Sequence, residues 1–213
     1  MPLPHEVPVS EEFTAPAGSA GGHERSFLFV LASTRKNGNS EALAEHAAAA
    51  LPGDVRQEWF RLSESPMSPF EDIRHTGSGE YPEPTGNDRL LWEATRAATD
   101  LVIVSPLYWY SLTASAKLYL DHWSGWMRVP GPSFKAEMGG KTLWGITALA
   151  SEERAKADPL IGTLHNCARY MDMRWGGVLL GNGTKPGQIH TDLPAVEEAG
   201  RFFGRAPVDS LAG

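Results

Sequence analysis

The sequence is poor in cysteine, in positive charge and in long apolar runs, and each shortage excludes a class of protein. Cys167 is the only cysteine among 213 residues, so the chain cannot form an intrachain disulfide or a cysteine-based zinc or iron–sulfur site. No segment approaches the roughly 20 apolar residues that span a bilayer. The formal net charge of −7 argues against general nucleic-acid binding, which depends on clustered Lys and Arg. We therefore expect neither a membrane nor a nucleic-acid partner.

Length and composition predict one domain with short terminal extensions. With 41% hydrophobic residues, 213 residues are enough for one full core. Residues 1–25 combine glutamates with Pro, Gly and Ala and contain no signal-peptide pattern. We predict a flexible tail there, or an arm on a neighbouring subunit, and a cytoplasmic location. The domain is predicted to span residues 26–205, followed by a C-terminal tail over residues 206–213.

Alternating strand and helix patterns predict an α/β fold. Apolar runs at 27–31 and 101–105 are typical of central strands buried on both faces. The alternation requires right-handed crossovers and a parallel sheet covered by helices on both sides. We therefore predict a three-layer, doubly wound, flavodoxin-like fold with five parallel strands in the order 2-1-3-4-5. The predicted strands are 27–31, 55–62, 101–105, 141–148 and 175–181, and the predicted helices are 41–50, 87–99, 114–127, 160–171 and 193–203.

The first loop, residues 33–40, offers several groups that bind phosphate. It follows a predicted central strand and precedes an alanine-rich helix, whose free N–H groups and dipole favour an anion. Helix capping explains Ser, Asn and Gly equally well, but one helix needs only one cap. The loop matches neither the Walker A spacing nor a dinucleotide fingerprint, so a single terminal phosphate fits best. The candidate ligands are Ser33, Thr34, Arg35, Asn37, Asn39 and Ser40.

A second loop, residues 106–111, follows the predicted strand 101–105 and carries three aromatic residues in a row. Because the chain turns there, the three rings cannot all enter one core. They form either a shelf for a flat ligand or a cover for the core or a dimer interface, and the pattern alone favours neither. The switch point of the predicted sheet places this loop beside residues 33–40. A phosphate site next to an aromatic shelf fits flavin mononucleotide (FMN).

The two loops resemble the NAD(P)H-dependent FMN reductase branch of the flavodoxin-like flavoproteins. The first loop of that family reads roughly Gly-Ser-x-Arg-x-x-Gly-Asn-Thr/Ser, and residues 32–40 read ASTRKNGNS. The second family signature is an aspartate, an apolar strand, Pro-x-Tyr and a helix with Lys and Asp. This chain has Asp100, then LVIVS and PLYW, then Lys117 and Asp121. The resemblance covers about residues 27–203.

The resemblance implies a role in FMN binding for the loops after the first, third and fourth strands. Relatives usually carry glycines in the last of these loops, whereas this chain has ALAS at 148–151. The connection over residues 63–86 has no cysteine, which excludes an iron–sulfur subtype, and its length predicts a lid or a disordered segment. The implied contacts are Ser33, Arg35, Asn39 and Ser40 with the phosphate, Pro106, Leu107, Tyr108 and Trp109 with the ring, and Thr147 and Ser151 with its pyrimidine edge.

The resemblance also implies an enzyme. Bound FMN would take a hydride from NADH or NADPH and pass electrons to a small acceptor such as a quinone, a free flavin or an azo compound, with no catalytic side chain and no metal required. The sequence does not choose between NADH and NADPH. Family members commonly form dimers, so we expect a homodimer or homotetramer. Two alternatives stay open: a flavodoxin-type electron carrier, and a binding module that has lost its cofactor.

Overall fold

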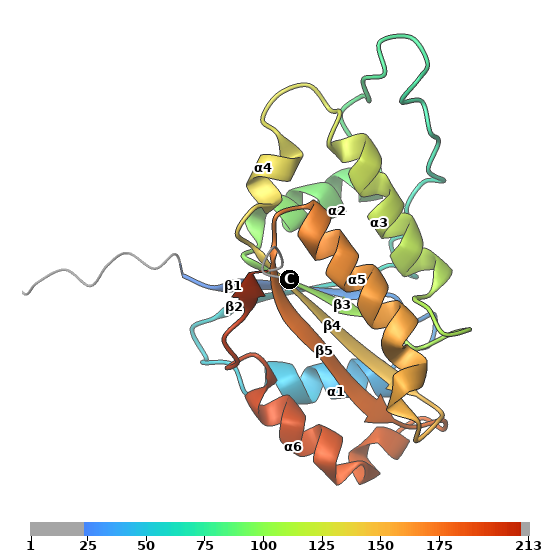
Figure 1. The fold of residues 1–213 in the computed structure, drawn as a ribbon, viewed down its shortest axis with the longest axis vertical. Coiled ribbons are helices and arrows are strands. Elements are labelled where there is room, and N and C mark those ends of the chain that lie inside the picture. The colour runs from blue at the N-terminus through green and yellow to red at the C-terminus, as the bar shows by residue number, and fades with distance from the viewer. Residues whose placement is uncertain (1–23, 210–213) are drawn as a thin grey trace, which may run out of the picture.

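A six-stranded sheet organises the protein, as seen in a computed structural model that describes residues 24–209. The strand order is β2-β1-β3-β4-β5-β6, and the first five strands run parallel (Figure 1). The predicted α/β fold with the order 2-1-3-4-5 is therefore confirmed. The strands are β1 (Ser26–Leu31), β2 (Arg56–Arg61), β3 (Asp100–Val104), β4 (Thr142–Leu149), β5 (Arg174–Asn182) and β6 (Val208–Asp209).

The last strand, β6, is an addition that the sequence pattern did not predict. Its two residues pair antiparallel with the start of β5, Val208 opposite Trp175 and Asp209 opposite Arg174. This pairing covers part of an edge that β5 would otherwise expose. Most of the predicted N-terminal tail and the last four residues of the chain lie outside the described residues.

Helices cover both faces of the sheet. α1 and α6 pack on one face, and α2, α3, α4 and α5 pack on the other (Figure 1). The five predicted helices are present with ends shifted by at most two residues, and α4, η1 and η2 are additional short turns. No helix within residues 24–209 has the length and apolar character needed to cross a membrane. The helices are α1 (Asn39–Ala48), α2 (Gly86–Ala97), α3 (Ala114–Trp126), α4 (Phe134–Met138), α5 (Asp158–Tyr170) and α6 (Leu193–Phe202), with 3-10 turns η1 (Arg154–Ala157) and η2 (Gln188–Thr191).

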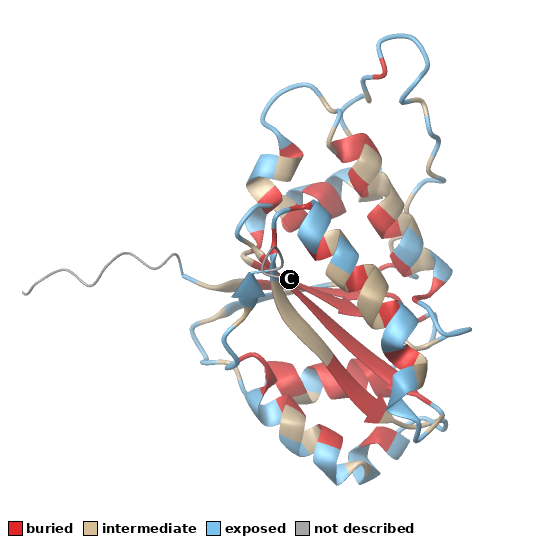
Figure 2. Cartoon of the chain, in the orientation of Figure 1, coloured by how far each residue is buried: buried red, intermediate tan, exposed pale blue. Residues whose placement is uncertain are grey.

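Side-chain alternation along the central strands builds two cores. In β1, Phe27 and Phe29 face α1 and α6, whereas Leu28 and Val30 face the helices of the other layer. All residues of β3 and β4 are buried, while β2 at the edge is half-exposed (Figure 2). The central strands have continuous apolar sequences because helices cover the side chains on both faces of the sheet.

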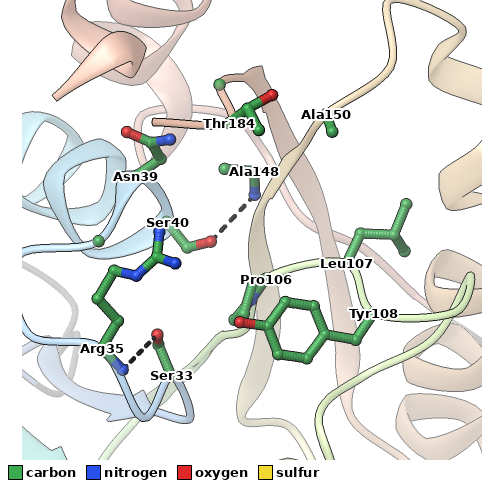
Figure 3. Close-up of a pocket in the computed structure, with 12 residues that line it drawn as sticks. Ser33, Arg35, Asn39, Ser40, Pro106, Leu107, Tyr108, Ala148, Ala150 and Thr184 are labelled. Carbon is green, nitrogen blue, oxygen red and sulfur yellow. Dashed lines mark hydrogen bonds between the residues drawn. The ribbon is translucent and has the colours of Figure 1, made fainter. Parts of the chain in front are cut away.

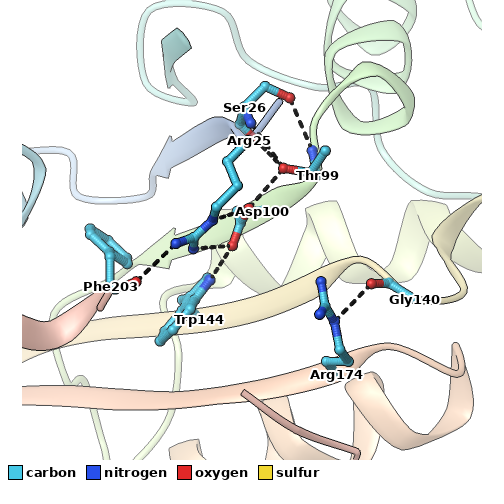
Figure 4. A network of polar contacts seen from close by, with 8 residues as sticks. All are labelled: Arg25, Ser26, Thr99, Asp100, Gly140, Trp144, Arg174 and Phe203. Carbon is cyan, nitrogen blue, oxygen red and sulfur yellow. Dashed lines mark hydrogen bonds and ion pairs between the residues drawn. The ribbon is translucent and has the colours of Figure 1, made fainter. Parts of the chain in front are cut away.

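A buried carboxylate ties the amino ends of the strands together. Asp100, the first residue of β3, accepts hydrogen bonds from the guanidinium of Arg25 at 2.7 and 3.2 Å, from Trp144 Nε1 at 2.9 Å and from Thr99 Oγ1 at 2.8 Å (Figure 4). Arg25 also donates to the carbonyl of Phe203 at 3.0 Å. The aspartate of the second family signature therefore lies at the opposite end of β3 from the aromatic loop.

The long connection between β2 and α2 packs along α3. The ring of Tyr81 lies against Gly125, where an added Cβ would come within 2.7 Å of the ring. Phe70 stacks on Tyr81, and His122 hydrogen-bonds the carbonyl of Ser68 at 2.8 Å. The segment runs past the far end of α3 (Figure 1), away from the carboxyl edge of the sheet. Most of this connection therefore lies away from that edge in this structure, and its role as a lid stays a prediction.

Candidate functional site

A pocket of about 170 Å³ opens at the carboxyl edge of the sheet, where the loops after β1, β3, β4 and β5 meet (Figure 3). The two loops that the sequence singled out thus share one cavity, as the switch point predicts. This volume is smaller than the roughly 300–1,000 Å³ of pockets that enclose a whole ligand, so a larger ligand would extend into solvent. The lining residues are Ser33, Arg35, Gly38, Asn39, Ser40, Pro106, Leu107, Tyr108, Ala148, Ala150, Gly183 and Thr184.

The first loop presents donors to this pocket. α1 begins after Gly38, whose N-cap position makes no side-chain cap, so the first turn keeps N–H groups that the helix does not use. Ser33 Oγ accepts from the backbone N–H of Arg35 at 3.1 Å and shapes the turn. Within residues 24–209 the guanidinium of Arg35 makes no ion pair. The arrangement is an anion cradle with one uncompensated positive charge.

Two polar side chains of this cradle hold neighbouring loops in place. Ser40 Oγ accepts from the backbone N–H of Ala148 at 3.1 Å (Figure 3). Asn39 donates to the carbonyl of Lys185 at 3.0 Å and accepts from the N–H of Ile189 at 3.3 Å. Gly183 is needed beside Asn39, because an added Cβ would lie 2.7 Å from Asn39 Nδ2. The Asn39 amide is therefore bound by the protein itself, and its backbone N–H is what it offers a ligand.

The aromatic loop is a tight hairpin. Tyr108 and Ser111 exchange two backbone hydrogen bonds of 3.1 and 3.0 Å around Trp109 and Tyr110, whose φ angles are 49° and 65°. Two left-handed residues make this a type I′ turn, which usually contains Asn-Gly. The Tyr108 ring borders the pocket (Figure 3), whereas Trp109 is 94% exposed and does not line it. Only the first of the three aromatic residues therefore forms a wall of the site.

Ion pairs flank the first loop. Arg61, the last residue of β2, pairs with Glu41 in the first turn of α1, and Lys36 pairs with Glu64. Hydrogen bonding to Glu41 raises the pKa of Arg61, and hydrogen bonding to Lys36 lowers the pKa of the Glu64 carboxyl. Arg61 and the Glu64 carboxyl therefore stay charged at neutral pH. In the described part of the chain, no three His, Cys, Asp or Glu side chains are placed to hold a metal ion.

Comparison with known proteins identifies the family. A family model described as a flavodoxin-like fold matches residues 25–201. This chain belongs to the flavodoxin-like family. The Bacillus subtilis protein YwqN, named as an NAD(P)H-dependent FMN-containing oxidoreductase, is 32% identical to it over 174 residues, which are 81% of this chain and 93% of that protein. The family membership expected from the two loop motifs is confirmed.

Solved structures share the fold. A structure of the Trp repressor binding protein from Bacillus subtilis is 25% identical with a TM-score of 0.65, and the match covers 84% of this chain and 99% of that one. A structure of an FMN-dependent NADH-azoreductase from Bacillus anthracis, in complex with FMN, is 14% identical with a TM-score of 0.56, and the match covers 85% and 100% of the two chains. At this identity the second likeness concerns the fold alone.

Seven of the twelve residues predicted from the sequence line the pocket of this flavodoxin-like protein, and five do not. Thr34, Asn37 and Trp109 have exposed side chains. Thr147 is buried within β4, on the opposite face from Ala148, because successive strand residues point to opposite sides. Ser151 accepts from Lys156 Nζ and from the N–H of Glu153. The seven are Ser33, Arg35, Asn39, Ser40, Pro106, Leu107 and Tyr108.

Sequence reasoning missed the loop after β5. Gly183 and Thr184 line the pocket next to Asn39. The segment 182–184 reads Asn-Gly-Thr after an apolar strand, which is the same kind of signal as the first loop. However, β5 lies three positions from β1 in the sheet, and the contact of its loop with Asn39 forms only in the folded structure.

Proposed function

We propose that this protein is a cytoplasmic FMN-dependent oxidoreductase that uses NADH or NADPH to reduce a small acceptor such as a quinone, a free flavin or an azo compound. The observation that carries the proposal is the single pocket in which the uncapped start of α1 and Arg35 meet the wall formed by Tyr108. The name of the 32% identical relative, which includes both FMN and NAD(P)H, supports the choice of cofactor and electron donor.

The residues present suit the phosphate end of FMN. Gly38 leaves open the space that a side chain would fill, because a Cβ there would point toward Ser33 Oγ and the Arg35 carbonyl at 3.6 Å. The N–H groups of the first turn of α1 would donate to phosphate oxygens, and the Arg35 guanidinium would supply the counter-charge. Thr184 adds a hydroxyl from the other side of the pocket.

The aromatic end of the cofactor would lie toward Pro106, Leu107 and Tyr108. When bound, the isoalloxazine ring of FMN supplies the electron-transfer chemistry. The Tyr108 side of the pocket would hold the ring, and the small side chains of Ala148 and Ala150 would let the backbone approach its edge. The shallow pocket leaves part of the ligand accessible, as two successive substrates require. In this proposal, protein groups bind and orient, and none acts as a nucleophile.

A cofactor titration and an anaerobic reduction test the proposal. Purified protein is expected to take up FMN, and NADH or NADPH is expected to bleach the flavin absorbance, which the acceptor then restores. FMN uptake without bleaching would instead identify a flavodoxin-type electron carrier. Absence of uptake would identify a binding module without cofactor. A screen of quinone, free flavin and azo acceptors with both nicotinamides would then define the reaction.

We also propose that the protein forms a homodimer or homotetramer. An apolar surface groove of about 400 Å³ between α3 and α5 supports this assembly. Its walls include Trp123, Met127 and the exposed Tyr170. Sedimentation analysis is expected to give a dimer or larger, and Tyr170→Lys is expected to weaken it, whereas a monomeric wild-type protein would contradict the proposal.

A further inference from the structure

Glu41 lies where a carboxylate both helps and harms a phosphate site. It is the third residue of α1, and its Oε2 accepts from the backbone N–H of Asn37 at 2.9 Å, just before the N-cap Gly38. This contact is a variant of the capping box, in which an acidic third residue reaches back to the loop. It also holds Asn37 in its left-handed conformation, with a φ of 54°. Glu41 thereby fixes the shape of the cradle.

This contact between Glu41 and the Asn37 N–H, called the clamp below, places a negative charge beside the position where an anion would bind. The Glu41 side chain is only 7% exposed, so water screens it poorly. An unpaired carboxylate in the first turn would compete with a phosphate for the same N–H groups and repel it. The loop therefore needs a partner for Glu41 that cancels the charge without breaking the clamp.

Arg61 has the geometry of such a partner. It is 17% exposed and approaches both oxygens of Glu41 through Nη1 and Nη2, with Nη1 to Oε2 at 3.1 Å. This two-point contact is the favoured arrangement of guanidinium and carboxylate. Arg61 is held in place because it pairs with Leu31 in the sheet register, directly before the first loop. The contact that holds the loop therefore comes from α1, and its neutralising charge comes from β2, the strand paired with β1.

The neighbouring charges are balanced in the same way. Lys36 pairs with Glu64, whose Oε1 is also 3.7 Å from Arg61 Nε. Among these five groups, Arg35 alone has no opposite charge as partner. The loop thus directs one net positive charge to the pocket.

We propose that Glu41 and Arg61 act as one positioning pair for the phosphate end of the ligand: Glu41 holds the loop in its binding shape, and Arg61 removes the repulsion that this carboxylate would exert. The inference rests on the proposed function, because it takes FMN as the ligand. Neither residue lines the pocket, so both would act through the loop and its field.

The test compares FMN with riboflavin, which has the same ring and no phosphate, by fluorescence titration. Arg61→Met leaves Glu41 unpaired and is expected to weaken FMN binding about tenfold, as one uncompensated charge near a dianion would at intermediate dielectric, with riboflavin binding unchanged. The defect should shrink as salt rises, because screening weakens repulsion. The double variant E41Q/R61M keeps an acceptor for the Asn37 N–H and has no charge, so FMN affinity should return close to that of wild type.

Two further variants separate this role from a structural one. Arg96→Met breaks the Arg96–Glu137 pair, a two-point pair between α2 and α4 far from the pocket, and is expected to leave FMN binding unchanged. Glu41→Gln alone should bind FMN at least as tightly as wild type, and this variant keeps the inference testable if Arg61→Met does not fold.

Several results would overturn the inference. These are an Arg61→Met variant that binds FMN like wild type, a double variant as weak as Arg61→Met, equal losses for FMN and riboflavin, or an E41Q variant with weakened FMN binding. Each of them leaves the proposed function intact, since wild-type binding is measured first. If wild-type protein takes up no FMN, the proposed function itself fails, and the inference fails with it.

Discussion

Removing the Asp100 carboxylate should destabilise the fold without touching the pocket. In Asp100→Ala, Trp144 Nε1 loses its acceptor inside the core, where the Trp144 ring is fully buried. An unsatisfied buried donor costs about 1–3 kcal/mol. The Arg25 pair adds less, about 0–1 kcal/mol, because the arginine side chain is 41% exposed and partly solvated. With the lost Thr99 contact included, we expect the free energy of unfolding to fall by about 3 kcal/mol in total.

Thermal and urea unfolding measure this change. For a chain of this size, about 3 kcal/mol corresponds to a fall in Tm of about 6–12 °C. Asp100→Asn keeps one acceptor for Trp144, so its free energy of unfolding should fall by roughly half as much as that of Asp100→Ala. FMN affinity at 25 °C should be unchanged in both variants, because Pro106 is six positions beyond Asp100 along extended chain, a distance of roughly 20 Å. A loss below about 1 kcal/mol in Asp100→Ala would refute the view that this network anchors the strands.

Three further predictions concern the loops of the site. In Gly38→Ala the added Cβ meets no close contact and the φ of −75° is ordinary, so the Tm should match that of wild type. The methyl group would fill space at the proposed phosphate site, so FMN titration should show roughly tenfold weaker binding. Equal affinity would place the phosphate elsewhere. Gly183→Ala should displace the Asn39 amide, lower the free energy of unfolding by about 1–2 kcal/mol and weaken FMN binding. Gly53→Ala is the control for the same assays and should change neither quantity, because an added Cβ there meets nothing within 4 Å. Trp109→Gly removes the strain of a side chain at a left-handed position and should raise the free energy of unfolding in urea by up to about 1 kcal/mol. FMN uptake should not change. Weaker uptake would show that this ring contacts the cofactor.

Two residues predicted at the site, Trp109 and Thr147, do not line the pocket, and the reasons are physical. Trp109 was expected to contact the ring because three aromatic residues in a row cannot enter one core, but Trp-Tyr carries no sign of the two-residue hairpin that turns it outward. Thr147 was expected in a loop, but β4 extends to Leu149 and alternation buries its side chain. In both cases a local backbone choice, which depends on neighbouring segments, decided which way the side chain points.

The sequence by itself determined the layered fold, the order of its strands and the two loops at the switch point, because buried apolar runs and helix-forming segments alternate strongly enough to leave few other topologies. Only the tertiary structure decided which groups reach the pocket. The contacts that matter there join Asn39 to the loop after β5, Ser40 to β4 and Glu41 to Arg61. Each joins residues from separate elements of the fold, and no periodicity or local motif records a contact that forms only when the whole sheet is assembled.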